Sequence, residues 1–400
     1  MAKTKLKVVS LFSGCGGLDL GFVGGFNFRQ FRLPQNDFEL VYSNDFDRDA
    51  EYVYNRNAVQ FFRRHRLNFG DIREVSTGDI PEFDVLLAGF PCQPFSNAGL
   101  RGSVLDSKGR GTLFYECERI LKDAIRRQEE PPSAFVFENV RGILSSKMPD
   151  GTPVVDEITR RMNKLGYEVS TQLVNSSEYG VPQNRYRVLM VGIRKEFGRF
   201  DFSLLNQVRK RAGLPSSSEG CIDLTIGAVF SDIPKDSPQF ADHWKYSPSG
   251  QTMVEQIGPV PGGKKLLNKF ASVSSIEELP EQAFEGRSWK NIPPSLLTPR
   301  FRKIYDDPKK YHAPNFYRRF ALGEICGTIT ASAQPENCGI THPFENRRMT
   351  VREAARIQSF PDNFEFDTST LPGAYKVIGN AVPPILGWVI ARSVQKHLGR

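Results

Sequence analysis

A single cysteine, Cys92, lies between two prolines in the segment G-F-P-C-Q-P-F-S. A lone cysteine is usually a small buried hydrophobic residue, but flanking prolines restrict the backbone and favour a thiol that is held in place. Such a thiol can act as a nucleophile once its thiolate fraction is raised locally. The residue types therefore predict covalent chemistry at Cys92 without indicating the substrate.

Three further groups that could take part in chemistry follow Cys92 in the chain. Glu138 lies in F-E-N-V after an apolar run, and a partly desolvated carboxyl group can donate a proton near neutral pH. Arg185 and Arg187 lie two residues apart in Q-N-R-Y-R-V, so on an extended segment they would point to one face. They could bind a carboxylate or a phosphate in bidentate fashion, while scaffolding by salt bridges is an equal alternative for Arg185.

A glycine-rich turn, F-S-G-C-G-G-L-D-L-G-F, spans Phe12 to Phe22 and would begin the first helix. Its spacing differs from the dinucleotide pattern G-x-G-x-x-G, and it lacks the Lys-Ser/Thr ending of a phosphate loop. A nucleoside without a pyrophosphate fits better. Tight packing of a strand against a helix would explain such glycines equally well.

Two aspartates follow expected strands further along the chain. Asp45 in S-N-D-F-D could accept both ribose hydroxyls, with Phe46 stacked on an adenine. Asp71 in G-D-I could accept the adenine amino group while Ile72 covers the ring. Each aspartate alone is more often a helix cap, but positions at successive strand ends favour a nucleoside site.

The elements that must position these residues form an α/β pattern. From Lys7 to about Ile193, short apolar runs alternate with longer helix-compatible stretches, which predicts a parallel sheet flanked by helices. The carboxyl ends of parallel strands meet at one sheet edge, where Cys92 and Glu138 would come together. The expected strands are 7–12, 39–43, 84–88, 134–137, 167–174 and 186–192, and the expected helices are 47–66, 113–127 and 153–165.

After about Phe197 the composition changes to Pro, Ser, Gly and Lys with little periodicity, which indicates a second, irregular domain. Within it, the stretch from Arg300 to Arg319 holds seven basic residues interleaved with aromatic ones. Such a mixture suits a surface that contacts phosphates, and a solvated face over a small core is an even alternative. The aromatic residues are Phe301, Tyr305, Tyr311, Phe316 and Tyr317.

Composition narrows the class of protein. The chain has 53 Lys plus Arg against 45 Asp plus Glu, and the formal charge of +8 favours a polyanionic partner such as nucleic acid. Six cysteines are scattered without a C-x-x-C pair, which argues against a zinc site or a disulfide framework. No apolar stretch approaches the roughly twenty residues that span a bilayer, and no cleavage site follows the N-terminus. We therefore expect a soluble cytoplasmic protein.

The motifs resemble, in order, those of the DNA cytosine-5 methyltransferase family of bacterial restriction-modification systems. The segments quoted above match, and two more follow: R-R-M-T-V-R-E-A-A-R-I-Q-S-F-P-D, from Arg347 to Asp362, and G-N-A-V-P-P, from Gly379 to Pro384. Together they frame nearly the whole chain except about 195–325. That stretch corresponds to the target-recognition region of the family, so its basic and aromatic residues now favour DNA binding.

The resemblance implies a Rossmann-like S-adenosylmethionine-dependent methyltransferase domain at 1–195. A smaller, irregular mixed target-recognition domain would follow at 196–370, and a C-terminal segment, 371–400, would return to the catalytic domain. The implied methyl donor is S-adenosylmethionine, the product S-adenosylhomocysteine, and no metal is needed. The implied cofactor-binding residues are Phe12, Ser13, Gly14, Gly16, Gly17, Leu18, Asp45, Phe46, Asp71, Ile72, Pro91, Asn380 and Val382. Many relatives carry Glu at the position of Asp45, but the shorter carboxylate should still reach the ribose.

In the mechanism that the resemblance implies, Cys92 adds to carbon 6 of a cytosine while Glu138 protonates ring nitrogen 3, so that carbon 5 takes the methyl group. Arg187 would contact the base and orient Glu138, and Arg185 would help position the site. A stacked base must first be flipped out, and the glycine-containing stretch 97–110 would close over it. The implied DNA contacts are Gln93, Ser96, Arg110, Arg318 and Arg319, with Thr112 supporting that loop.

The expected role is sequence-specific modification of double-stranded DNA in a bacterial cytoplasm, at the nucleoid. A cognate restriction endonuclease would act in the same system, and no stable protein partner or membrane would be required. Methylation of transfer RNA, by the branch that typically carries P-P-C-Q-P-F-T, is disfavoured by Ser96 and by the long insert. A catalytically silent DNA-binding protein is disfavoured by intact Cys92, Glu138, Arg185 and Arg187.

Overall fold

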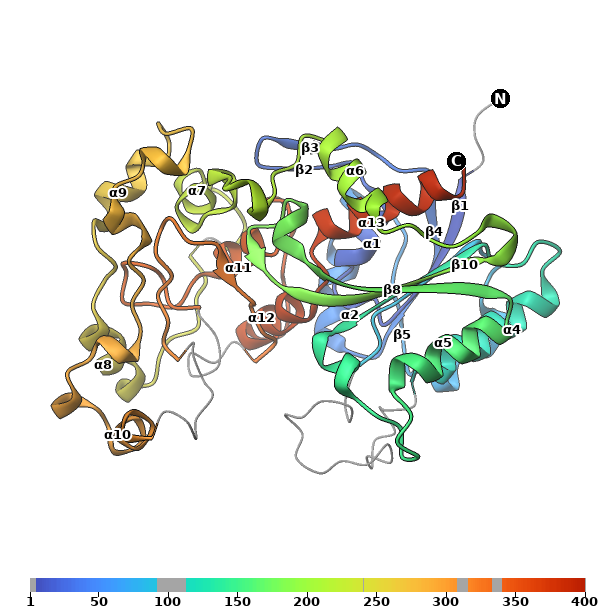
Figure 1. The fold of residues 1–400 in the computed structure, drawn as a ribbon, viewed down its shortest axis with the longest axis horizontal. Helices are drawn as coiled ribbons and strands as arrows, with labels where there is room; N and C mark the ends of the chain where they lie inside the picture. Colours follow the sequence, from blue (N-terminus) through green and yellow to red (C-terminus); the bar gives the residue numbers. More distant parts are fainter. Residues whose placement is uncertain (1–4, 92–112, 240, 308–315, 333–339, 400) are drawn as a thin grey trace. The chain divides into compact units, whose positions relative to one another are not determined.

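The computed structural model describes residues 5–91, 113–239, 241–307, 316–332 and 340–399 (Figure 1). The chain divides into two compact units. The first unit takes Met1–Tyr179, Tyr186–Leu214 and Val382–Arg400, and the second takes Gly180–Arg185 and Pro215–Ala381. The first unit therefore extends beyond the expected boundary at 195, and it takes up the chain again at Val382 instead of residue 371.

A seven-stranded sheet forms the centre of the first unit. All six expected strands are present, and the sheet order is β5-β4-β1-β6-β7-β10-β8. β10 is antiparallel to both of its neighbours, so the expectation of a wholly parallel sheet is wrong at this edge. The physical reason is the short connection from β8 to β10, since a parallel crossover needs a dozen or more residues. The strands are β1 (Leu6–Leu11), β4 (Phe38–Asp45), β5 (Asn68–Phe69), β6 (Val85–Ala88), β7 (Ala134–Val140), β8 (Tyr167–Asn175) and β10 (Tyr186–Arg194).

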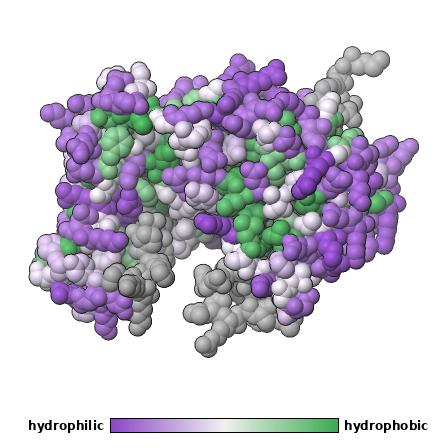
Figure 2. Space-filling view, in the orientation of Figure 1, coloured by the Kyte–Doolittle hydropathy of each residue, from purple (hydrophilic) through white to green (hydrophobic). Residues whose placement is uncertain are grey.

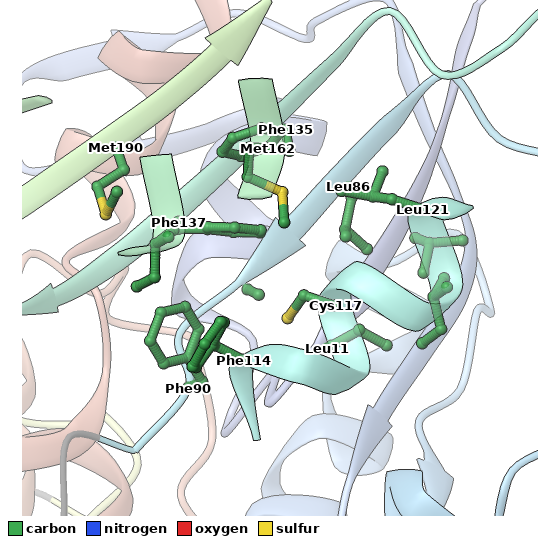
Figure 3. Close-up of a cluster of buried hydrophobic side chains, with 14 of the residues drawn as sticks. Leu11, Leu86, Phe90, Phe114, Cys117, Leu121, Phe135, Phe137, Met162 and Met190 are labelled. Atoms are coloured by element: carbon green, nitrogen blue, oxygen red, sulfur yellow. The ribbon is translucent and has the colours of Figure 1, made fainter. Parts of the chain in front are cut away.

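Helices cover both faces of this sheet (Figure 1). On one side lie α1 (Gly17–Val23), α6 (Ser203–Arg211) and α13 (Pro384–His397), and on the other lie α4 (Phe114–Arg127) and α5 (Val154–Lys164). Alternate residues of a strand point to opposite faces, so Val9 and Leu11 of β1 reach the cluster beneath α4 and α5. The core of this face also contains Leu86, Phe114, Phe135, Phe137 and Met162 (Figure 3).

The expected helix 47–66 is broken near its middle. It forms α2 (Arg48–Arg56) and α3 (Ala58–Phe61), with Asn57 between them. The side chain of Asn57 donates a hydrogen bond to the carbonyl of Val53 (2.8 Å), and such local bonds compete with continuation of a helix. A hairpin of β2 (Phe26–Phe28) and β3 (Phe31–Leu33) precedes β4 and has no counterpart in the sequence-based expectations.

The apolar C-terminal part packs inside the protein. The stretch Leu371–His397 is long and apolar enough to cross a membrane, contrary to the expectation that no stretch would be, but 89% of its most apolar window is buried. Within the first unit, the backbones of α1 and α13 lie very close together. A Cβ placed on Gly21 of α1 would lie only 2.5 Å from the carbonyl carbon of Gly387 in α13. The face drawn in Figure 2 is mostly hydrophilic, with apolar side chains in small patches. We therefore interpret the stretch as core helices.

The second unit is irregular. A short parallel pair joins β9 (Gln183–Asn184) to β11 (Cys326–Gly327), and single turns connect many of its helices. Its small core contains Phe301, Phe316 and Tyr317, so these aromatic residues fill the interior rather than offering faces to nucleic-acid bases. The helices are α7 (Ile226–Ser231), α8 (Pro248–Ile257), α9 (Gly263–Lys269), α10 (Pro299–Asp306), α11 (Val351–Ile357) and α12 (Leu371–Asn380).

Candidate active site

The glycine turn connects β1 to α1 through left-handed backbone. Phe12 has φ 55°, a strained value for a residue other than glycine, and Gly14 and Gly16 have φ 57° and 86°. A Cβ on Gly16 would lie 2.6 Å from the Phe62 ring, so a larger residue does not fit there. A Cβ on Gly14 would meet nothing within 4 Å, so space is open beside the turn at this point.

Asp45, at the end of β4, is tied to this turn. Its carboxylate accepts hydrogen bonds from the backbone N–H of Gly14 (2.8 Å) and of Asp47 (2.9 Å). Burial raises the pKa of Asp45, and these N–H donors oppose the rise. Each carboxylate oxygen keeps a lone pair for a further donor. Phe46 beside it is 60% exposed, so its ring is open to a planar partner.

The remaining expected cofactor residues differ in exposure. Asp71 is held by Arg73, whose Nε lies 2.9 Å from Oδ1, and this hydrogen bond lowers the pKa of Asp71. Ile72 is 2% exposed and packs in the core, and its contact with an adenine ring stays a prediction. Phe12, Ser13, Gly14 and Pro91 are half-buried, Asn380 is exposed, and Gly16, Gly17, Leu18 and Val382 are buried.

Glu138 and Arg187 form a shielded ion pair on neighbouring antiparallel strands. Glu138 of β7 lies opposite Leu189 of β10, and Arg187 is two residues from Leu189, so the pair is diagonal on one face of the sheet. Arg187 Nε lies 2.7 Å from Glu138 Oε1, and both side chains are about 10% exposed. Burial lowers the pKa of Arg187, and the charge of Glu138 opposes that effect. Arg187 therefore orients the Glu138 carboxylate.

Asn139 ties this strand end to the segment that leads to Cys92. Its side-chain N–H donates to the carbonyl of Phe90 (3.0 Å). The Glu138 carboxylate lies beside Gly89, where a Cβ would be 3.7 Å from Oε2. Cys92 itself, together with Gln93, Ser96, Arg110, Thr112 and the stretch 97–110, lies outside the described residues.

Arg185 binds different partners from Arg187. It belongs to the second unit, is 1% exposed, and donates to the carbonyls of Ile329 (3.1 Å) and Gly379 (2.9 Å). Arg185 and Arg187 therefore bind different groups. The contacts of Arg185 are of a scaffolding kind, although they reach backbone carbonyls instead of the carboxylates of salt bridges, and its part in positioning the site stays a prediction.

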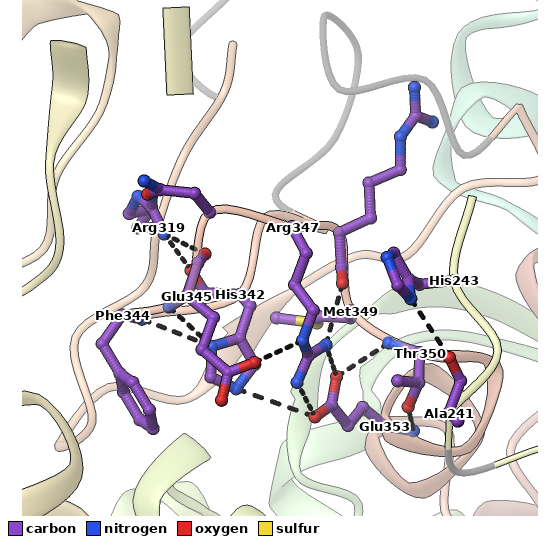
Figure 4. Close-up of polar contacts among 12 residues, drawn as sticks. Ala241, His243, Arg319, His342, Phe344, Glu345, Arg347, Met349, Thr350 and Glu353 are labelled. Atoms are coloured by element: carbon purple, nitrogen blue, oxygen red, sulfur yellow. Dashed lines mark hydrogen bonds and ion pairs between the residues drawn. The ribbon is translucent and has the colours of Figure 1, made fainter. Parts of the chain in front are cut away.

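Arg319 is also buried, contrary to the expectation that it contacts DNA. It is 0% exposed, and its guanidinium donates to the carbonyls of His342 (2.6 Å) and Glu345 (2.6 Å) (Figure 4). It also donates to the carbonyl of Val254 (3.0 Å). These bonds use the donors that a phosphate would need. Arg318 is partly exposed and paired with Glu324 (2.6 Å), so a DNA contact there stays a prediction.

The sequence reasoning missed Asp19, a fully buried carboxylate below the glycine turn. It accepts hydrogen bonds from the hydroxyls of Ser10, Ser43 and Tyr54, and burial raises its pKa to about 6. The signal was present in the sequence, because one acidic residue interrupts the apolar run L-D-L-G-F.

The chain is similar to known proteins in its sequence and in its fold. A family model described as C-5 cytosine-specific DNA methylase matches residues 6–396. The Type II methyltransferase M.NgoPII of Neisseria gonorrhoeae is 31% identical over 99% of this chain and 97% of its own length. M.FnuDI of Fusobacterium nucleatum, also a Type II methyltransferase, is 31% identical over 98% of this chain and 95% of its own length. A crystal structure described as that of a prophage-encoded DNA modification methyltransferase from E. coli has a TM-score of 0.59 at 20% identity, and the match covers 99% of this chain and 100% of that one.

Proposed function

The chain belongs to the C-5 cytosine-specific DNA methylase family, and from this premise we propose that it methylates cytosine within a specific sequence of double-stranded DNA, with S-adenosylmethionine as the methyl donor. Its membership of this family identifies it as a DNA cytosine-5-methyltransferase. The observation that carries the finer proposal is the Glu138–Arg187 pair, which lies beside Gly89 at the start of the segment with Cys92.

The residues around the glycine turn suit a nucleoside ligand. Open space beside Gly14, free lone pairs on Asp45 and the exposed ring of Phe46 together match a ribose and an adenine. When bound, S-adenosylmethionine supplies an electrophilic methyl group. Asp71 and Pro91 stay proposed contributors from the first unit.

Cys92 would form a bond from its sulfur to carbon 6 of a flipped-out cytosine, while Glu138 delivers a proton to ring nitrogen 3. Carbon 5 then carries enough electron density to take a methyl group. Methyl transfer would leave S-adenosylhomocysteine. Loss of the carbon-5 proton to a base, elimination of the sulfur and return of the nitrogen-3 proton to Glu138 would then restore the ring and the enzyme. Arg187 supports this series of steps because it holds the Glu138 side chain in one orientation inside a shielded site.

The relatives that match over nearly their whole length are named as Type II methyltransferases. We therefore place the activity in a bacterial restriction-modification system, where a cognate endonuclease would cut the unmodified sequence. DNA in the cytoplasm is the expected substrate, and no stable protein partner is required for the chemistry.

Incubation with tritiated S-adenosylmethionine and either duplex DNA or transfer RNA tests the proposal. We expect label in the duplex, recovered as 5-methylcytosine after hydrolysis. Label in transfer RNA instead would assign the protein to the RNA-modifying branch. Label in neither substrate would contradict the proposed activity.

A further inference from the structure

A buried polar cluster lies below the glycine turn and has no part in the proposed reaction. It consists of Asp19, Ser10, Ser43 and Tyr54, and we call it the Asp19 cluster. The Ser10 hydroxyl donates to Asp19 Oδ1 (2.6 Å), and the hydroxyls of Ser43 (3.0 Å) and Tyr54 (2.8 Å) donate to Oδ2. The hydroxyls come from β1, β4 and α2, so one carboxylate joins a helix to the two strands that carry the cofactor residues.

The cluster is connected to the turn on the side of β1 and β4. The Ser13 hydroxyl donates to the carbonyl of Ser10 (3.1 Å), and the backbone N–H of Ser13 donates to the carbonyl of Asn44 (3.1 Å). Asn44 directly follows Ser43, and the next residue is Asp45, which accepts from the turn. A shift of Ser10 or Ser43 would therefore move both the turn and the Asp45 carboxylate.

Tyr54 connects the cluster to the other end of the turn. Its ring stacks on Phe62, with ring centroids 4.2 Å apart. A Cβ on Gly16 would lie 2.9 Å from the Tyr54 ring, so the ring supports the left-handed backbone of this glycine directly. The hydroxyl that binds Asp19 fixes the position of that ring.

Burying the Asp19 carboxylate costs more free energy than burying an apolar side chain that would fill the same space. Burial raises its pKa to about 6 from the ordinary 3.8, so ionisation of this carboxyl group is less favourable in the folded protein than in water. Removing a carboxylate from water costs stability, and the three hydroxyl donors recover only part of that cost. An apolar side chain would avoid this cost but would bind none of the three hydroxyls.

We propose that Asp19 is a positioning residue for S-adenosylmethionine: through Ser10, Ser43 and Tyr54 it fixes the shape of the turn from Ser13 to Gly16 and the direction of Asp45. The inference rests on the proposed function. Asp19 itself touches no reacting atom, so loosening the cluster weakens cofactor binding and leaves the methyl-transfer step intact.

A matched pair of tyrosine variants of the full-length protein tests the inference. Tyr54→Phe removes the hydroxyl that binds Asp19 and keeps the ring. Tyr167→Phe removes an equally buried hydroxyl on the distant strand β8, which donates to the carbonyl of Pro132 (2.8 Å). We measure the Kd of S-adenosylmethionine by calorimetry, the kcat and KM with duplex DNA, and the thermal midpoint.

Tyr54→Phe should raise the Kd and the KM for S-adenosylmethionine about five- to tenfold, while kcat at saturating cofactor stays within about twofold. Tyr167→Phe should lower the thermal midpoint by a similar amount, but its Kd and KM for S-adenosylmethionine should stay within about twofold of the wild-type values. Ser10→Ala, with the same expected rise, replaces Tyr54→Phe if that variant does not fold.

A Kd for Tyr54→Phe equal to that of Tyr167→Phe, at an equal loss of midpoint, would overturn the inference, because the cluster would then only support the fold. Wild-type protein that binds no S-adenosylmethionine would overturn the proposed function and this inference together. The titration of the wild-type protein therefore distinguishes the second result from the first.

Discussion

The two units bury charged side chains for different purposes. In the first unit, Glu138 and Asp19 are shielded carboxylates near strand ends, close to the residues that we assign to catalysis and cofactor binding. In the second unit, several of the buried charges are arginines bonded to backbone carbonyls, beside ion pairs such as Arg347 with Glu353 and Arg356 with Asp362. Arg319 binds three carbonyls, and Arg352 binds those of Pro238, Pro361 and Phe364.

The difference follows from secondary structure. A regular sheet satisfies its own carbonyls, whereas the irregular second unit contains many carbonyls without a strand or helix partner. A guanidinium has five N–H donors in a rigid fork and can satisfy several carbonyls at once. A buried arginine in such a unit therefore indicates structural support, and part of the +8 charge is not available to DNA.

Replacing Glu138 should reduce catalysis without unfolding the protein, because we assign its buried carboxylate in the first unit to the reaction. Glu138→Gln keeps an oxygen that can accept from Arg187 but cannot deliver a proton as readily. We expect single-turnover methyl transfer to fall about 10²- to 10⁴-fold while cooperative unfolding is retained. A variant with more than a tenth of the wild-type rate would remove Glu138 from its proposed role.

Replacing Arg319 should lower the stability of the protein, because we assign its buried guanidinium in the second unit to structural support. Arg319→Met keeps the apolar stem and leaves several buried oxygens without a donor, so the free energy of unfolding should fall by about 3 to 5 kcal/mol. The control is Arg300→Ala, which removes the same charge from an exposed site and should change stability by less than about 0.5 kcal/mol.

Denaturant unfolding of both variants measures the effect, and DNA binding is measured in parallel. A stable Arg319→Met protein that has lost DNA affinity would contradict the structural assignment. It would instead restore Arg319 to the DNA-contacting residues.

The pH dependence of stability should report the cost of burying Asp19. Burial raises its folded pKa to about 6 from 3.8, and the charge of Asp45 adds to the rise while the three hydroxyls oppose it. Between these values the folded state keeps a proton that the unfolded state has lost, so stability falls as pH rises. The wild-type protein should lose about 2 to 3 kcal/mol relative to Asp19→Asn between pH about 4 and about 6. Unfolding curves of both proteins across that range test this, and parallel pH profiles would contradict it.

The regular part of the fold could be predicted from the sequence because apolar runs of β-branched residues mark buried strands. The place of β10 between β7 and β8 could not, since it depends on contacts between segments far apart in the chain, whereas its antiparallel direction was implied by the short connection after β8. The break at Asn57 depends on one side-chain hydrogen bond to Val53, and a propensity pattern does not contain it.

The candidate site was accessible from the sequence where a residue type is unusual for its position. Glu138 and Asp45 follow apolar strands, and their types alone suggested a role. The Glu138–Arg187 contact could be predicted only through the resemblance, because the register of β7 and β10 joins residues far apart in the chain. The role of Arg319 was misjudged because a basic residue between aromatic ones has the same pattern on a surface and in an irregular core.

Methylation of carbon 5 of cytosine in DNA should depend on Cys92. Bisulfite sequencing of DNA from cells that express the wild-type protein or Cys92→Ala measures this dependence. We expect protected cytosines at one recurring sequence with the wild-type protein and none with the variant. Protected cytosines in equal number with Cys92→Ala, or none with either protein, would contradict it.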